Sequence, residues 1–327
     1  MMKISVVIPI KNEHATLSKL VTLIFSSVKA MPRSCDVEVI LVDDGSDDDS
    51  WLLIEKLSEN FGKAIKGIKL RRNFGKAIAL EAGFRAANGD VIFTMDGDLQ
   101  DDPKEIPRFL DKLDQGYDLV SGWKIKRYDP ISKTLPSKLF NKVTSWATGV
   151  DLHDFNCGFK CYKREVIDRL SVYGELHRYV PVLAADLGFK VGEIEVEHHP
   201  RQHGVSKYGW ERYLRGFVDL ITVLATTRWL NKPGHLFGGI GILFGFMGGL
   251  MLLYMSMLWF MGFGPIGNRP FLLFGVMFSI FSLQMISLGI IAEFFIKVGN
   301  PRRVDALTAE VVGFNISKPS TDGLKKE

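Results

Sequence analysis

The chain has 327 residues, of which 46% are hydrophobic and 24% are charged, and its formal net charge is only +4. This length allows one large domain or two smaller ones, and the composition excludes a disordered chain. So small a charge argues against nucleic acid as the partner. Three cysteines are too few for a disulfide-built secreted domain and indicate a reducing compartment. Cys157 and Cys161 lack a second ligand pair for zinc, so we interpret them as packing thiols.

Strand and helix patterns alternate along the first hundred residues. Apolar, β-branched runs predict strands at 4–10, 37–42, 64–70 and 91–95, and helical spacing predicts helices at 13–28, 49–61 and 75–87. This alternation predicts an α/β fold with a doubly wound, mostly parallel sheet. Polar clusters follow three of the strands, at 11–13, 43–46 and 96–98. Because ligands bind beyond the carboxyl ends of such strands, we expect these clusters to converge.

The main chemical feature is the segment Asp96-Gly97-Asp98-Leu99-Gln100, which follows a predicted buried strand. Two carboxylates two residues apart point roughly the same way once the chain turns. They are hard oxygen ligands for Mg²⁺ or Mn²⁺, and Gln100 offers a neutral oxygen. A solvated turn is the alternative, but polar clusters after the preceding strands favour a metal site that would bridge a diphosphate.

Two long apolar runs occupy the C-terminal third. Residues 236–263 carry no charge, and 271–298 are interrupted only by Gln284, Glu293 and Lys297. Each run exceeds the roughly 20 residues that cross a bilayer. A pair of buried core helices is the alternative, but charge-free runs of this length favour two membrane spans. The glycines of the first run would allow close packing against a neighbouring helix.

The basic residues around these runs predict the orientation. Basic side chains precede the first span and follow the second, whereas the loop between them offers only Arg269; the flanking residues are Arg228, Lys232, His235, Lys297, Arg302 and Arg303. The positive-inside rule then puts both termini and the N-terminal domain in the cytoplasm. The first ten residues enter a strand pattern directly and do not read as a signal peptide. We therefore expect a multi-pass protein of the inner (plasma) membrane.

Residues 209–231 link the two parts. Leu214, Phe217, Val218, Ile221 and Leu224 recur at helical spacing, and aromatic residues suited to an interface flank them. The same stripe would also serve a helix packed on the soluble domain, so both interpretations stay open. The predicted organisation is a catalytic domain at 1–208, an amphipathic juxtamembrane helix at 209–232, two transmembrane helices at 233–299 and a cytosolic tail at 300–327.

Several motifs in order resemble glycosyltransferase family 2. These are VVIPIKNE, VDDGS, LRRNFGKAIALEAGFRAANGDVIFTMDGDLQDDP and HPRQHGVSKY, spread over roughly residues 4–210. The pattern is most similar to polyprenyl-phosphate hexose synthases, both the dolichyl-phosphate mannose type and the bacterial bactoprenol glucosyltransferase type. The resemblance implies a GT-A fold, a nucleotide-sugar donor, a divalent metal (Mg²⁺ or Mn²⁺) and a polyprenyl phosphate acceptor.

The resemblance also implies a set of donor residues. Matching positions for the nucleotide, its diphosphate and the metal are Pro9, Asn12, Glu13, Asp43, Asp44, Asn73, Gly75, Lys76, Asp96, Asp98 and Gln100. A carboxylate at Asp43 or Asp44 can accept hydrogen bonds from a base N–H or from ribose hydroxyls. A helix-capping turn is the alternative for 43–46, and a surface charge is the alternative for Lys76. Lys11 stands where many relatives have an aromatic residue, which weakens inference about the base.

Three basic segments are candidates for the acceptor phosphate. They contribute Lys124, Lys126, Arg127, Lys133, Ser137, Lys138, Arg201, His203, Ser206 and Lys207. Basic groups beside the predicted interfacial helix suit a phosphate at a membrane surface. Attraction to anionic lipid alone is the alternative for the first two segments.

The expected reaction is inverting transfer of a single hexose, with Asp154 near the sugar by resemblance. An acceptor phosphate is already anionic and needs positioning rather than a strong base. We expect UDP-glucose and undecaprenyl phosphate, with GDP-mannose and a dolichyl acceptor as the alternative. A processive synthase is disfavoured because Ala225 replaces the glutamine of its Gln-x-x-Arg-Trp motif. A nucleotide-sugar-binding module and a nucleotidyltransferase remain as rivals, and the transmembrane region could support a homo-oligomer.

Overall fold

The computed structural model describes residues 1–125, 131–170, 176–199, 211–224, 227 and 233–299. Its strands are β1 (Met2–Ile10), β2 (Cys35–Asp43), β3 (Ile65–Lys69), β4 (Val91–Thr94), β5 (Leu119–Trp123), β6 (Lys160–Lys163) and β7 (Val191–Glu195). Its longer helices are α1 (His14–Lys29), α2 (Ser50–Phe61), α3 (Lys76–Ala86), α4 (Ile106–Asp114), α5 (Ile131–Thr148), α6 (Arg164–Arg169), α7 (Val180–Asp186), α8 (Glu211–Leu224), α9 (Pro233–Phe260) and α10 (Pro270–Gly299).

The seven strands form one sheet in the order β3-β2-β1-β4-β6-β5-β7. Neighbouring strands are parallel except for β6, which runs antiparallel to both β4 and β5. The four strands and three helices predicted in the first hundred residues are confirmed, with ends within two residues of the prediction. Because the chain runs from β1 outward through β2 to β3 and then returns to β4 on the other side of β1, the strand order reverses between β1 and β4, and folds of this kind bind ligands in a crevice beyond the carboxyl ends of such strands.

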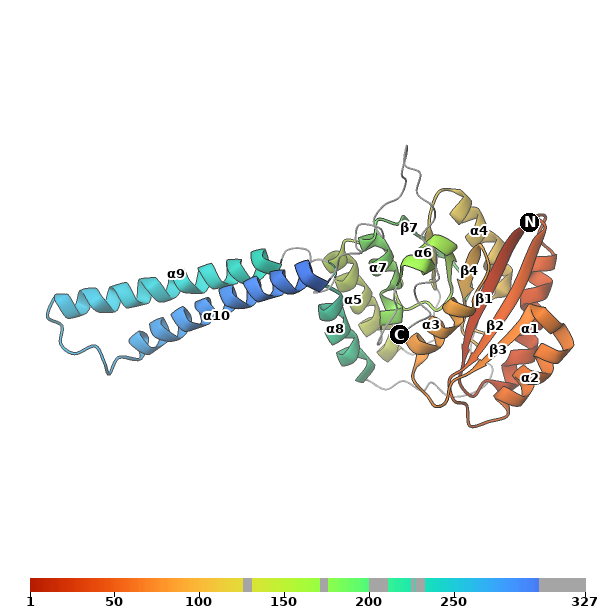
Figure 1. Cartoon of the computed structure of the whole chain (residues 1–327), viewed down its shortest axis with the longest axis horizontal. Helices are drawn as coiled ribbons and strands as arrows, with labels where there is room; N and C mark the ends of the chain where they lie inside the picture. Colours follow the sequence, from red (N-terminus) through yellow and green to blue (C-terminus); the bar gives the residue numbers. More distant parts are fainter. Residues whose placement is uncertain (126–130, 171–175, 200–210, 225–226, 228–232, 300–327) are drawn as a thin grey trace.

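Helices cover both faces of the sheet (Figure 1). One face packs against α1, α2 and α4 through a core that includes Leu20, Ile54 and Phe109. The other face packs against α3, α6 and α7, where Phe84 and Tyr162 meet edge to face. Strand residues alternate between the two cores, as Val6 and Val7 do on β1, so each central strand is buried on both sides.

A third, smaller core ties helix α8 to the domain. Leu220 and Val223 of α8 pack with Leu152 and Phe155 of the loop before β6 and with Tyr179 at the start of α7. The Tyr179 hydroxyl also donates a hydrogen bond to the Gly216 carbonyl, with 2.7 Å between the oxygens. The opposite side of α8 exposes Val218 and Ile221. The helix therefore has two apolar faces. One packs on the domain, as the second interpretation predicted, and the other is exposed and is available for the interfacial role that the first interpretation predicted.

Helices α9 and α10 form a long hairpin that extends from the domain beside α5 and α8 (Figure 1). Among the described residues, these two helices are long and apolar enough to cross a membrane, and little of either is buried within the protein. They approach closely through small residues, as expected from the glycines. A Cβ at Gly241 would lie 2.7 Å from Ile286, and one at Gly248 would lie 2.8 Å from the Ser279 hydroxyl. Glu293 of α10 accepts a hydrogen bond from the Gly234 amide in the first turn of α9 (3.0 Å).

Candidate active site

The carboxyl ends of six strands meet at one edge of the sheet, together with the amino end of antiparallel β6. The loops after β1 and β2 interlock there. The Asn12 amide donates to Ser46 Oγ and the Asp47 amide donates to Asn12 Oδ1, both at 2.9 Å. Lys11 reaches the Gly45 carbonyl and the Asp47 carboxylate. Asn12 adopts a left-handed backbone with φ of 55°, so this side chain shapes the turn in addition to bordering the crevice.

The acidic pair after β2 is buried and organises the neighbouring loop. Asp44 accepts hydrogen bonds from the amides of Phe74 (2.7 Å) and Gly75 (2.9 Å), which holds the start of α3 against β2. Asp43 Oδ1 accepts the Ser46 amide, as a turn-capping carboxylate does. Among the described residues, Asp43 Oδ2 is buried and has no hydrogen-bond partner. A buried acceptor without a partner is costly and suits a ligand N–H or hydroxyl.

Asp96 lies at the end of β4 and is paired with Lys76 at the start of α3. Its carboxylate rests on the backbone of Gly158, where an added Cβ would come within 2.6 Å of Asp96 Oδ2. Burial alone would raise the pKa of Asp96, but Lys76, Lys124 and Lys160 outweigh it and hold that pKa well below its usual range. Asp96 is therefore an anion at the crevice, and about a third of its side chain is exposed.

The residues after Asp96 present further oxygens. Asp98 is buried, and its Oδ1 accepts the Gln100 amide at 3.2 Å. Leu99 between them has a left-handed φ of 60°, which makes the tight turn. The Thr16 hydroxyl of α1 holds this turn through the Gly97 carbonyl (2.7 Å). Asp96, Asp98 and Gln100 supply only oxygen donors on one short turn, so this set fits Mg²⁺ or Mn²⁺.

Lys124, predicted as an acceptor contact, forms an ion pair within the protein. Its ammonium pairs with Asp101 at 2.6 Å, and the Asp101 side chain is fully buried. Burial alone would lower the pKa of Lys124, but Asp101, Cys157 and Asp96 raise it above its usual value. Sequence reasoning assigned no role to Asp101, although it directly follows Gln100. Its partner directly follows β5, 23 residues further along the chain, so only the fold brings the two together.

The other predicted acceptor residues are spread over α5 and segments outside the described residues. Ser137 is half-buried on α5, which also contains Lys133, whose side chain lies outside the described part of the chain. Arg127, Arg201, Ser206 and Lys207 fall outside the described residues. The described residues just before Arg201 contact the turn at 96–100, since the His199 amide donates to the Gln100 carbonyl at 3.0 Å.

Asp154 is 1% exposed and lies on the loop between α5 and β6. Sequence reasoning missed two charged residues that contact this loop, Glu193 of β7 and Lys160 of β6. It also missed His177, whose Nδ1 is buried and has no hydrogen-bond partner within the described chain. Burial, with smaller effects from Lys76 and Arg178, lowers the pKa of His177 far below its usual value. None of these residues belongs to a motif, so no local signal marked them.

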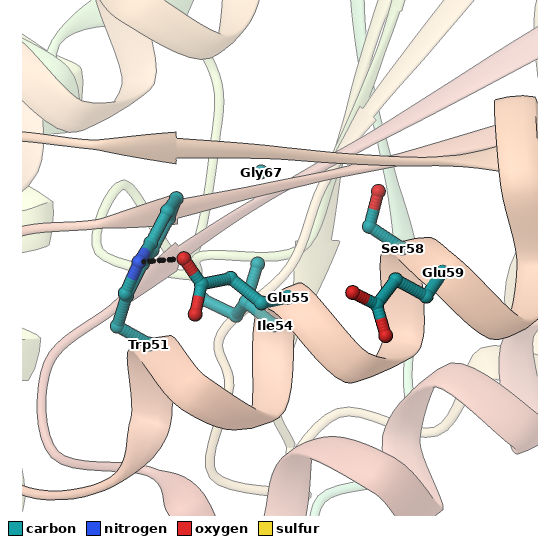
Figure 2. Close-up of a pocket in the computed structure, with 6 residues that line it drawn as sticks. All are labelled: Trp51, Ile54, Glu55, Ser58, Glu59 and Gly67. Atoms are coloured by element: carbon teal, nitrogen blue, oxygen red, sulfur yellow. Dashed lines mark hydrogen bonds between the residues drawn. The ribbon is translucent and has the colours of Figure 1, made fainter.

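Two further features lie outside the predicted set. Side-chain ligand atoms of Asp102, Glu197 and His199 lie within 4.8 Å of one another at the crevice edge. A hollow of about 610 Å³ lies between α2 and β3, where Trp51 donates to Glu55 at 2.7 Å (Figure 2). It is lined by Trp51, Ile54, Glu55, Ser58, Glu59 and Gly67. None of the candidate residues lines this hollow.

A mostly parallel sheet with acidic strand ends and a D-x-D turn defines a GT-A-type glycosyltransferase. Comparison with known families agrees, because residues 5–171 match the family model described as glycosyl transferase family 2. The chain belongs to this family and is a glycosyltransferase.

Curated relatives match nearly the whole chain. A dodecaprenyl-phosphate galacturonate synthase from Rhizobium johnstonii is 39% identical over 89% of this chain and 87% of its own length. An undecaprenyl-phosphate 4-deoxy-4-formamido-L-arabinose transferase from Aeromonas hydrophila is 36% identical over the same shares. Both relatives transfer a sugar to a polyprenyl phosphate, and the two sugars differ.

Solved structures share the fold of the catalytic domain. The glucosyl-3-phosphoglycerate synthase of Mycobacterium tuberculosis, in complex with Mn²⁺, UDP-glucose and phosphoglyceric acid, matches with a TM-score of 0.51. The match has 18% identity and covers 69% of this chain and 79% of that one. The same enzyme with Mg²⁺ and UDP also gives a TM-score of 0.51. At this identity the likeness establishes the fold alone.

Proposed function

We propose that this enzyme transfers one hexose from a nucleotide-sugar donor to a polyprenyl phosphate at a membrane surface, with inversion at the anomeric carbon. The observation that carries the proposal is the meeting of Asp43, Asp44, Lys76, Asp96 and Asp98 at one sheet edge, in a chain that continues into two apolar helices. The named curated relatives act on polyprenyl phosphates, which supports the same acceptor class here.

The donor would lie across the ends of β1, β2 and β4. Asp43 Oδ2, buried and without a partner among the described residues, suits an N–H or hydroxyl of the nucleoside. Pro9, Asn12, Glu13 and the Asp44 loop would border it. We favour a UDP-sugar, with UDP-glucose the first to test and GDP-mannose the alternative.

The leaving diphosphate needs positive charge. Lys76, paired with Asp96, would contact it by exchanging this carboxylate partner for a phosphate oxygen. Asp96, Asp98 and Gln100 would hold Mg²⁺ or Mn²⁺, which supplies neutralisation of the charge that develops on the leaving group. Asp154 would orient a sugar hydroxyl or stabilise positive charge at the anomeric centre. The acceptor phosphate attacks from the opposite face, which inverts the configuration.

The acceptor would approach along α5 from the bilayer. Helix α5 exposes Leu139, Val143 and Trp146 on one face, and the Trp146 side chain is 84% exposed. Val218 and Ile221 of α8, which packs against α5, are also exposed, as are Lys138 and Lys142 of α5; the first candidate span follows α8 eight residues later. Exposed aromatic and apolar groups beside lysines suit an anionic lipid surface. Lys133 and Ser137, earlier on α5, and Arg127, Arg201, Ser206 and Lys207 would then hold the acceptor phosphate, and both termini would be cytoplasmic.

A donor panel tests the proposal. Radiolabelled UDP- and GDP-sugars are incubated with the full chain, Mn²⁺ or Mg²⁺, and undecaprenyl phosphate in vesicles. We expect one sugar to appear in the lipid fraction with matching release of nucleoside diphosphate. Absence of lipid-linked label with every donor would reject the acceptor. In a parallel reaction with a nucleoside triphosphate and a sugar 1-phosphate, formation of a nucleotide sugar with release of inorganic diphosphate would indicate a nucleotidyltransferase. A Trp146→Ala variant should raise the KM for undecaprenyl phosphate in vesicles, and Phe61→Ala, at another exposed aromatic residue, should leave it unchanged.

A further inference from the structure

The loop that carries Asp154 also supports Asp96. This loop runs from the end of α5 to the start of β6, and Gly158 near its end forms the floor beneath the Asp96 carboxylate. The Gly158 carbonyl is itself fixed, because the Thr94 hydroxyl of β4 donates to it at 2.8 Å. Residues 153–158 therefore set the separation between the two carboxylates.

A carboxylate whose side chain is 12% exposed holds the amide side of this loop. Glu193 of β7 accepts hydrogen bonds from the amides of His153 (3.0 Å) and Asp154 (3.1 Å) and contacts His153 Nδ1 at 2.9 Å. The Trp123 ring stacks on His153 with 4.0 Å between ring centroids. Buried Asn141 donates to the His153 carbonyl at 2.8 Å, so this end of the loop is held from three elements.

A buried ammonium holds the carbonyl side. Lys160, 3% exposed at the start of β6, donates to the carbonyls of Phe155 (3.3 Å) and Cys157. Burial lowers the pKa of Lys160, while Cys157, Asp154 and Asp96 act in the opposite direction, which places this ammonium within electrostatic range of both acidic residues. Burying the Lys160 ammonium and most of the Glu193 carboxylate is expensive, and an apolar core would serve packing alone better. Their hydrogen bonds go to the backbone of one loop and to the His153 ring on it, which indicates a positional role.

We propose that Glu193 and Lys160 are positioning residues that clamp residues 153–158 and thereby fix the distance between Asp154 and Asp96. The inference rests on the proposed role of Asp154 at the sugar. Neither residue contacts the substrate in this arrangement. The clamp acts through Asp154, so its loss should reduce the rate of transfer more than the affinity for the nucleotide.

The test is a double-mutant cycle in the full-length enzyme. Glu193→Gln keeps the size and one acceptor oxygen but removes the charge, and Asp154→Asn removes the carboxylate that the clamp positions. We expect Glu193→Gln to lower kcat roughly 10- to 100-fold with little change in the dissociation constant for UDP. In the Asp154→Asn background the same substitution should have almost no further effect. Independent, multiplicative losses would overturn the proposal, as would an unchanged kcat in Glu193→Gln.

A second pair of variants keeps the test decisive if Glu193→Gln folds poorly. Lys160→Arg retains a donor and its charge, and Lys160→Met removes both. Rescue of kcat in the arginine variant relative to the methionine variant supports the clamp, and equal losses in two folded variants oppose it. Exposed Glu195→Gln on β7 and Lys163→Met on β6 are the matched controls, and both should keep normal kinetics.

Failure of the proposed function gives a different result. Wild-type enzyme that transfers no sugar to undecaprenyl phosphate would reject that acceptor. The positioning role would then be tested by measuring kcat for hydrolysis of the donor, which needs no lipid acceptor. The same double-mutant cycle and the same criteria would apply.

Discussion

The ion pair between Lys124 and Asp101 allows a direct test of what stabilises the turn at residues 96–101. In Lys124→Met the Asp101 carboxylate would stay fully buried, and within the described residues the Asp96 amide, 3.4 Å away, would remain as its hydrogen-bond donor. Removing one partner of a buried pair costs about 3–5 kcal/mol. Because Lys124 is 12% exposed, we expect the lower end, about 3 kcal/mol. For a domain of this size that corresponds to a loss of roughly 6–12 °C in Tm.

The double variant Asp101→Asn with Lys124→Met removes both charges and should recover all but about 1 kcal/mol. Thermal unfolding in detergent measures both variants, with exposed Lys142→Met as the control. The acceptor KM of the double variant should stay near that of the wild type. A stable Lys124→Met variant with an acceptor KM raised equally in the single and double variants would refute this reasoning, because Lys124 would then bind the acceptor.

Three further predictions concern charge and backbone. Burial alone would raise the pKa of Glu38, but Lys66, Ser5, Asn88 and Lys3 together lower it to about 2, from an ordinary value of 4.5. A carboxyl group whose pKa is lowered by folding stabilises the folded state at pH values above its ordinary pKa. Glu38→Gln should therefore cost about 2 kcal/mol at pH 7, after allowance for the partly exposed lysines. The difference in Tm between wild type and variant should shrink as the pH falls from 5 to 2. Asp96→Asn and Asp98→Asn should each lower kcat roughly 10²- to 10³-fold, and chelation should stop nucleotide release by the wild type until Mn²⁺ or Mg²⁺ is restored; turnover that survives chelation would contradict the metal site. Gly158→Ala should displace the Asp96 carboxylate and weaken metal affinity roughly 10- to 100-fold, as measured by the Mn²⁺ concentration for half-maximal rate. An unchanged Mn²⁺ concentration would show that the backbone at 158 moves to accommodate the added methyl group.

The first half of the sheet could be predicted from sequence because its signals are local. Runs such as 4–10 and 37–42 are continuously apolar, since the strands they form are buried on both faces. The second half was not predicted in detail. Strand β6 has only four residues, Lys160–Lys163, and two of them are lysines. Nothing in such a segment distinguishes a central antiparallel strand from a loop.

Some residues of the candidate site could likewise be predicted from local sequence signals, and others could not. Asp43, Asp44, Asp96 and Asp98 follow strongly patterned strands, so parallel topology was enough to predict that they converge. Lys124 was assigned to the acceptor on charge alone, and its pairing with Asp101 depends on the position of β5 beside the metal loop.

The sequence by itself determined the family, the polar turns at the ends of β1 and β2, the D-x-D turn and the two apolar helices. Each of these features depends on contiguous residues, so the periodicity, the side-chain chemistry and the order of the residues are enough to identify it. Only the tertiary structure decided which charges meet. Lys124 and Asp101 are 23 residues apart in the chain, and Lys76 and Asp96 are 20 apart. Such pairs form because the packing of the sheet brings distant strand ends together, and the cost of burying a charge then selects a partner for each one.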